Sequence, residues 1–145
     1  MTTFSRMERR DRSAGRRGKG GGQGTAEDLR RRLRDVQDRP VAIKAIRQTA
    51  SEMIRREVSK KTARIIREVL AQCDYGLGNY AKAKVGFDLL LKELPQRSRS
   101  DRDRCNIVRE WLAKCKFQLD EIEEATADFL DLQETYANRE RPFWT

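Results

Sequence analysis

Apolar residues recur at three- and four-residue spacing along most of the chain after residue 25, which is the pattern of amphipathic helices. No stretch alternates apolar and polar residues with a period of two over a useful length, so we expect no β-sheet. The spacing predicts an all-α protein with about six helices. They are expected at about 26–38, 41–58, 60–76, 79–94, 101–118 and 120–137.

Turn and capping residues mark the breaks between these helices. Thr25 and Ser59 are expected to cap the first and third helices, and Ser100 or Asp101 the fifth, because side-chain oxygens accept hydrogen bonds from the free N–H groups there. Pro40 suits the first turn of the second helix. Gly76 and Gly78 end the third helix and Pro95 ends the fourth.

Two segments, 71–90 and 113–132, repeat the same pattern at a constant offset of 42 residues. Self-similarity of this kind is typical of helical repeat proteins, in which stacked helix pairs bury a shared core. The related pairs keep size and polarity class: Ala71/Ala113, Cys73/Cys115, Tyr75/Phe117, Leu77/Leu119, Tyr80/Ile122, Ala83/Ala125, Phe87/Phe129 and Leu90/Leu132. We expect Ala83, Phe87, Ala125 and Phe129 to form the core through which the two hairpins pack.

The second half of each copy resembles a tetratricopeptide repeat. In that family two antiparallel helices meet at a tight turn, a small residue lies at the crossing, an aromatic residue follows, and proline often ends the unit. Here the turn is Gly78-Asn79-Tyr80, followed by Ala83, Phe87 and Pro95. The resemblance covers about 75 of the 145 residues and implies an α-solenoid of antiparallel helix hairpins.

The chain departs from the family pattern in two ways. The first half of each copy keeps only a leucine and a small residue, Leu70-Ala71 and Leu112-Ala113, and the offset of 42 exceeds the usual period of 34. Residues 26–58 show no clear third copy, although they could form a degenerate pair. A general all-α bundle with two related hairpins is therefore the rival fold.

If the resemblance holds, the first helix of each pair lines a groove for a partner segment. An extended or helical peptide would suit such a surface, with aromatic anchors and a few charge partners. Packing of Tyr75 and Phe117 between helices is the alternative to ligand contact. The groove candidates are Ile65, Glu68, Gln72, Tyr75, Ile107, Glu110, Lys114 and Phe117.

Charge separates the chain into an arm, residues 1–24, and a helical domain, residues 25–145. The whole chain carries a net charge of +9, and the arm contributes seven basic residues against Glu8 and Asp11. The arm lacks apolar periodicity and ends in a glycine-rich run, so we expect it to be disordered. Its basic residues are Arg6, Arg9, Arg10, Arg12, Arg16, Arg17 and Lys19.

Three roles for the arm stay open. Such a segment neutralises phosphates without reading base sequence, which favours nucleic acid. An acidic protein or a membrane surface would attract it by the same charge. A tail without a specific role is the third interpretation.

Composition argues against an enzyme. The chain contains no histidine, so Cys–His and Ser–His–Asp catalysis are excluded, and zinc binding lacks a ligand set. Cys73, Cys105 and Cys115 are expected to be buried small hydrophobic residues, with Cys105 the most reactive because it lies nearest a loop. We expect no cofactor, no metal and no small-molecule substrate.

The same composition bears on the compartment. Three cysteines among helix-forming residues favour a reducing compartment, hence the cytoplasm, with a nuclear or organellar location open. No apolar run reaches the roughly 18 residues of a membrane span.

The last aromatic residues, Phe143 and Trp144 after Pro142, are expected to cover the free face of the final helix pair, with insertion into a partner as the alternative.

These observations predict a non-enzymatic adaptor or scaffold subunit that holds a protein segment in its groove. Because about three repeats are usually needed for stability, we also expect self-association or residence in a larger assembly. The alternative is a nucleic-acid-binding structural protein, such as a coat, nucleocapsid or ribonucleoprotein component. In it the helical body would assemble and the arm would neutralise phosphates.

Overall fold

The structure is a computed structural model that describes residues 21–56 and 58–140. This part of the chain contains six α-helices and no strand, which confirms the predicted all-α class. The helices are α1 (Gly21–Asp35), α2 (Pro40–Ile54), α3 (Lys60–Gly76), α4 (Tyr80–Glu93), α5 (Arg99–Gln118) and α6 (Ile122–Glu140). Among the described residues, no helix is long and apolar enough to cross a membrane.

Two helix starts differ from the predictions. α1 begins at Gly21, so Thr25 lies within the helix and does not cap it; the glycines before it are poor helix formers but do not block a helical backbone. α5 is capped by Ser98, whose Oγ accepts a hydrogen bond from the Asp101 N–H at 3.1 Å. Asp101 is then the third residue of the helix, and its carboxylate accepts the Ser98 N–H at 3.3 Å to complete a capping box.

The other predicted breaks agree with the structure. Ser59 caps α3 by accepting the Thr62 N–H at 3.1 Å, and Pro40 opens α2. α3 ends at Gly76, and α4 ends two residues before Pro95.

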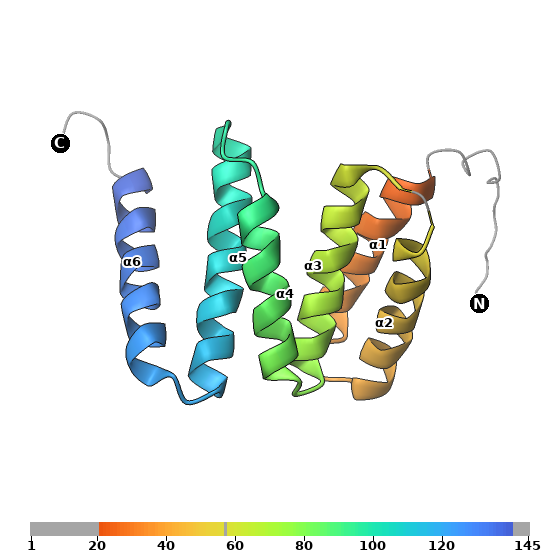
Figure 1. Cartoon of the computed structure of the whole chain (residues 1–145), viewed down its shortest axis with the longest axis horizontal. Helices are drawn as coiled ribbons and strands as arrows, with labels where there is room; N and C mark the ends of the chain where they lie inside the picture. The colour runs from red at the N-terminus through yellow and green to blue at the C-terminus, as the bar shows by residue number, and fades with distance from the viewer. Residues whose placement is uncertain (1–20, 57, 141–145) are drawn as a thin grey trace.

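The helices lie side by side in a row, with α1 and α2 at one end and α6 at the other (Figure 1). α3 packs against α1, α2 and α4, whereas α5 packs against α4 and α6. Two hydrophobic clusters result. One joins α1, α2 and α3 through residues such as Leu29, Ile46 and Ile66, and the other joins α3, α4 and α5 around Phe87 and Val108.

The turns after α3 and after α5 are built alike at the offset of 42 residues. Gly78 and Asp120 both adopt the left-handed conformation, with φ of 85° and 69°. In each turn the left-handed residue and the one after it donate to carbonyls of the helix end, as in a Schellman motif. The matched N···O distances are 3.0 and 3.2 Å for Gly78–Tyr75 and Asp120–Phe117, and 2.8 and 2.9 Å for Asn79–Asp74 and Glu121–Lys116.

Three of the four predicted core residues are buried, and the fourth is not. Ala83 and Phe87 are fully buried, and Ala125 is 1% exposed, whereas Phe129 is 37% exposed. This corrects the expectation for Phe129. Phe87 lies on the middle helix α4 and stacks on Trp111 of α5, with ring centroids 5.7 Å apart. Phe129 lies on α6, which ends the row and has α5 as its described neighbour.

Candidate functional site

The face formed by α1, α3 and α5 contains two cavities. The first, of about 310 Å³, lies beside the N-terminal halves of the three helices, and we call it the charged cavity. The second, of about 210 Å³, lies toward their C-terminal ends, and we call it the aromatic cavity. The buried Gln72 side chain, which lines the aromatic cavity, donates to Glu68 of the charged cavity at 3.0 Å, so the two cavities are neighbours.

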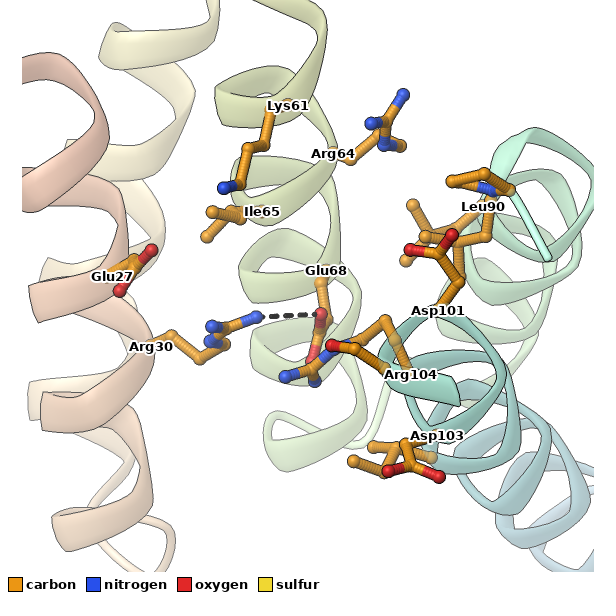
Figure 2. A pocket seen from close by; sticks show the side chains of 14 residues that line it. Glu27, Arg30, Lys61, Arg64, Ile65, Glu68, Leu90, Asp101, Asp103 and Arg104 are labelled. Atoms are coloured by element: carbon orange, nitrogen blue, oxygen red, sulfur yellow. Dashed lines mark hydrogen bonds and ion pairs between the residues drawn. The ribbon is translucent and has the colours of Figure 1, made fainter. Parts of the chain in front are cut away.

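Glu68 of α3 is the centre of the charged cavity and is only 3% exposed. Figure 2 shows Arg30 of α1 and Arg104 of α5 approaching its carboxylate from opposite sides. The nitrogen–oxygen distances are 3.4 Å for Arg30 and 3.0 Å for Arg104. A buried carboxylate needs such partners, because an unpaired buried charge is strongly unfavourable. The three side chains therefore connect three helices that are separate in sequence.

Two further cations line the charged cavity. Lys61 is exposed and Arg64 is half-buried, both on α3, and neither forms an ion pair with a described side chain. Four acidic residues line the same cavity: Glu68 is bound by two arginines, Asp101 is held in the capping box of α5, and the other two are the exposed Glu27 and the half-buried Asp103. Lys61 and Arg64 are therefore the cations most available to an incoming anionic group.

The aromatic cavity has walls of Tyr75, Tyr80 and Trp111. The rings of Tyr75 and Tyr80 meet edge to face with centroids 5.1 Å apart, and those of Tyr75 and Trp111 do so at 5.3 Å. Lys114 lies over the Trp111 ring, 4.6 Å from its centroid. Leu33 and Ile43 complete the apolar lining. Such a pocket suits one apolar or aromatic side chain of a ligand.

The structure divides the predicted groove residues into three groups. Ile65, Glu68 and Ile107 line the charged cavity. Gln72 and Tyr75 line the aromatic cavity. Glu110, Lys114 and Phe117 line neither cavity, and Phe117 is 54% exposed.

The difference arises from how α1 and α5 face α3. α1 packs on α3 and buries Ile65, Glu68 and Gln72, which we had expected to be open to a ligand. On α5 the residues that line the two cavities include Arg104, Ile107 and Trp111, so the lining agrees with the predicted stripe only at Ile107.

Several functional candidates were missed by the sequence analysis. Trp111 could have been noticed as the one tryptophan within the predicted helices, next to Leu112 of the repeat pattern. Arg30, Lys61, Arg64 and Arg104 carried no such signal, because arginine and lysine are common on any solvated helix face.

The cysteines are buried, and their environment disfavours the thiolate. Burial raises the pKa of Cys73 to about 12 and that of Cys115 to about 11. Cys105, expected to be the most reactive, is 5% exposed; burial raises its pKa as well, and its thiol donates to the Pro95 carbonyl at 3.7 Å. Because the thiolate is the nucleophile, these residues are poor candidates for covalent chemistry. Within 21–56 and 58–140, no three acidic or cysteine residues cluster as a metal site would require.

The basic arm residues Arg6, Arg9, Arg10, Arg12, Arg16, Arg17 and Lys19 lie outside the described residues, as do Phe143 and Trp144. Their predicted roles remain predictions. Residues 21–24, assigned to the arm from the sequence, belong to α1.

Comparison with known proteins identifies no family. No family model matches the chain, and neither a curated protein nor a solved structure matches it.

Proposed function

We propose that this protein is a non-enzymatic interaction adaptor that binds a partner segment across the charged and aromatic cavities. The observation that carries the proposal is the position of the two cavities on one face. Four helices, α1, α3, α4 and α5, contribute to both cavities, so the folded domain holds cationic and aromatic groups in a fixed relation. Preorganised groups of this kind favour binding because little ordering remains to be done when the ligand arrives.

The chemistry of the two cavities indicates the partner. Lys61 and Arg64 favour a carboxylate, and the aromatic walls favour an apolar or aromatic anchor. Arg64 and Tyr75 lie eleven residues apart on α3, which is about 16 Å along a helix at ~1.5 Å per residue. An extended segment covers that distance in about five residues. The proposed ligand thus has an acidic position and an apolar position about five residues apart.

The internal repeat supports a tetratricopeptide-like arrangement. The two matched turns follow α3 and α5, and Ala83 and Ala125 are buried at equivalent positions of the helices after them. Most residues of both cavities come from α1, α3 and α5, which are the first helices of their pairs, while α2 and α4 add Ile43, Tyr80 and Leu90. This is the face that the family resemblance implies for ligand binding.

The test is selection from a random peptide library displayed on phage, using the full chain as bait. We expect enriched sequences with acidic and apolar positions at the proposed spacing, and at least about tenfold weaker binding to the K61E/R64E variant, because two attractive charges become repulsive. The matched control K82E/K92E makes the same charge change on α4, outside both cavities, and should bind as the unmodified chain does. Absence of enrichment, or equal loss in both variants, would contradict the proposal.

The nucleic-acid alternative rests on the charge of residues 1–24 and predicts a different result. Nucleic acid would copurify with the full chain and be lost on removal of the arm, with affinity falling steeply as salt rises. Peptide binding by the helical domain, in contrast, should survive removal of the arm.

A further inference from the structure

The outward face of α6 exposes apolar side chains at the end of the row. Among the described helices α6 packs mainly against α5. Ile122 is 42% exposed, Phe129 37% and Leu130 59%. Ile122 and Phe129 lie two helical turns apart on the same side of α6. In a stack of helix pairs, this is the face against which a following pair would pack.

The same end of the molecule is strongly acidic. Residues 120–140 contain eight aspartates and glutamates and one arginine. Lys84 pairs with Glu121, and Lys116 pairs with Glu124 and Asp128, on the side that faces the body of the protein. The other acidic residues of the free face are Glu123, Asp131 and Glu134, which are exposed and form no ion pair with a described side chain.

The opposite end of the row has the complementary character. Residues 21–56 contain nine arginines and lysines against five acidic residues. On the outer side of α2, Val41 is 83% exposed, and Lys44, Ala45 and Gln48 follow at helical spacing, all exposed. Figure 1 shows α2 and α6 at the two ends of the molecule, where they are separated by the helices between them.

We propose that a second copy of this chain stacks head to tail on the first, with its α1–α2 end against the free face of α6, in place of the cover that Phe143 and Trp144 were expected to provide. The contact would join Val41 and Lys44 of α2 to Leu130 and the exposed acidic residues of α6, so apolar burial and charge attraction act together. Because the two surfaces differ, the contact is heterologous and repeats into rings or filaments. It uses neither cavity, so it is independent of the proposed peptide binding.

The test uses sedimentation velocity over a range of concentrations with two variants, each of which blocks one end. L130E places a charge on the α6 face, and V41E does so on the α2 face. Both positions are largely exposed, so the fold should be retained, and circular dichroism would verify this. L89E on α4 is the matched control, because Leu89 is 55% exposed and lies at neither end.

The unmodified chain and L89E are expected to form a concentration-dependent series of oligomers. L130E and V41E should each remain monomeric alone, yet form a dimer and nothing larger when mixed, because each supplies the end that the other lacks. Raising the salt should weaken association of the unmodified chain, since exposed charges are screened within about 8–10 Å at physiological ionic strength. A monomeric unmodified chain, association that survives either variant, or a mixture that stays monomeric would overturn the proposal. V41E that still dimerises alone, beside monomeric L130E, would indicate a contact between two α6 faces instead.

Discussion

Gly78 and Asp120 occupy equivalent positions in the two matched turns, although only glycine adopts a left-handed backbone without strain. A side-chain carbon at Gly78 would meet nothing within 4 Å, so any cost of substitution there is conformational and not a clash. Asp120 bears that conformational cost in the second turn, eased by a short polar side chain that tolerates the left-handed region.

We therefore expect opposite effects from two substitutions at this scale. G78A should lower the free energy of unfolding by about 1 kcal/mol, and D120G should raise it by about 0.5 kcal/mol, because glycine removes the left-handed penalty but adds chain entropy to the unfolded state. Urea denaturation followed by circular dichroism measures both. If D120G lowered the free energy of unfolding instead, the Asp120 side chain would stabilise the turn beyond what the backbone hydrogen bonds explain.

At the scale of elements, α3 connects the two hydrophobic clusters, since Ile66 and Val69 face α1 and α2 while Ala71 faces α4. Glu68 adds a polar connection from α3 to α1 and α5. Its equivalent at the offset of 42, Glu110, is 43% exposed and pairs with Lys114 within the same helix. Equivalent residues of the two copies thus have different surroundings.

That difference gives a matched pair of variants. E68Q should destabilise the fold by about 1–3 kcal/mol, because it leaves two arginines facing a neutral group in a largely buried site. E110Q should change stability by less than about 0.5 kcal/mol, as expected for an exposed pair within one helix. Thermal and urea unfolding of the two variants side by side provide the comparison. Equal effects would mean that the Arg30–Glu68–Arg104 contacts contribute little.

For the whole molecule, Cys73 and Cys115 report on the two clusters, because Cys73 belongs to the cluster of α1–α3 and Cys115 to that of α3–α5. Burial raises the pKa of both thiols, to about 12 and about 11. In the unfolded chain a thiol titrates near 8.5. The native state therefore holds these protons to higher pH than the unfolded state does.

Linkage then predicts a loss of stability in mild alkali. The contribution of the two thiols is fully present below about pH 8.5 and declines as the pH rises toward their native pKa values, by up to ~1.4 kcal/mol per thiol and pH unit. The C73A/C115A variant should show a shallower decline between about pH 9 and pH 10.5, although its stability at neutral pH will be lower because of the lost volume. Urea midpoints of both proteins across that range are the measurement. Parallel curves would show that the thiols titrate normally in the native state.

Periodicity was sufficient to place the helices because each amphipathic helix carries its own pattern. The breaks at Pro40, Gly76 and Pro95 are local effects of backbone geometry, so they could be predicted from neighbouring residues alone. The cap of α5 was predicted at Ser100 or Asp101, but Ser98 caps the helix. Asp101 is the third residue of the helix and completes the capping box with Ser98.

Burial of individual residues was predicted less well, because it depends on which neighbour a helix has. Phe87 and Phe129 are equivalent in sequence, yet Phe87 lies between helices and Phe129 lies at the end of the row. The groove residues show the same effect, since α1 covers Glu68 while Lys114 stays half-exposed above Trp111.

The sequence by itself determined the helical class, most helix ends and the similarity of the segments 71–90 and 113–132, because these follow from spacing and turn residues within short stretches of chain. Only the tertiary structure decided that Arg30, Glu68 and Arg104 meet, and that Trp111 forms a cavity wall with Tyr75 and Tyr80. Arg104 and Arg30 lie 36 and 38 positions from Glu68 in the sequence. Such contacts depend on how each helix is rotated about its axis against its neighbours. Apolar periodicity predicts which side of a helix is buried, but not that rotation.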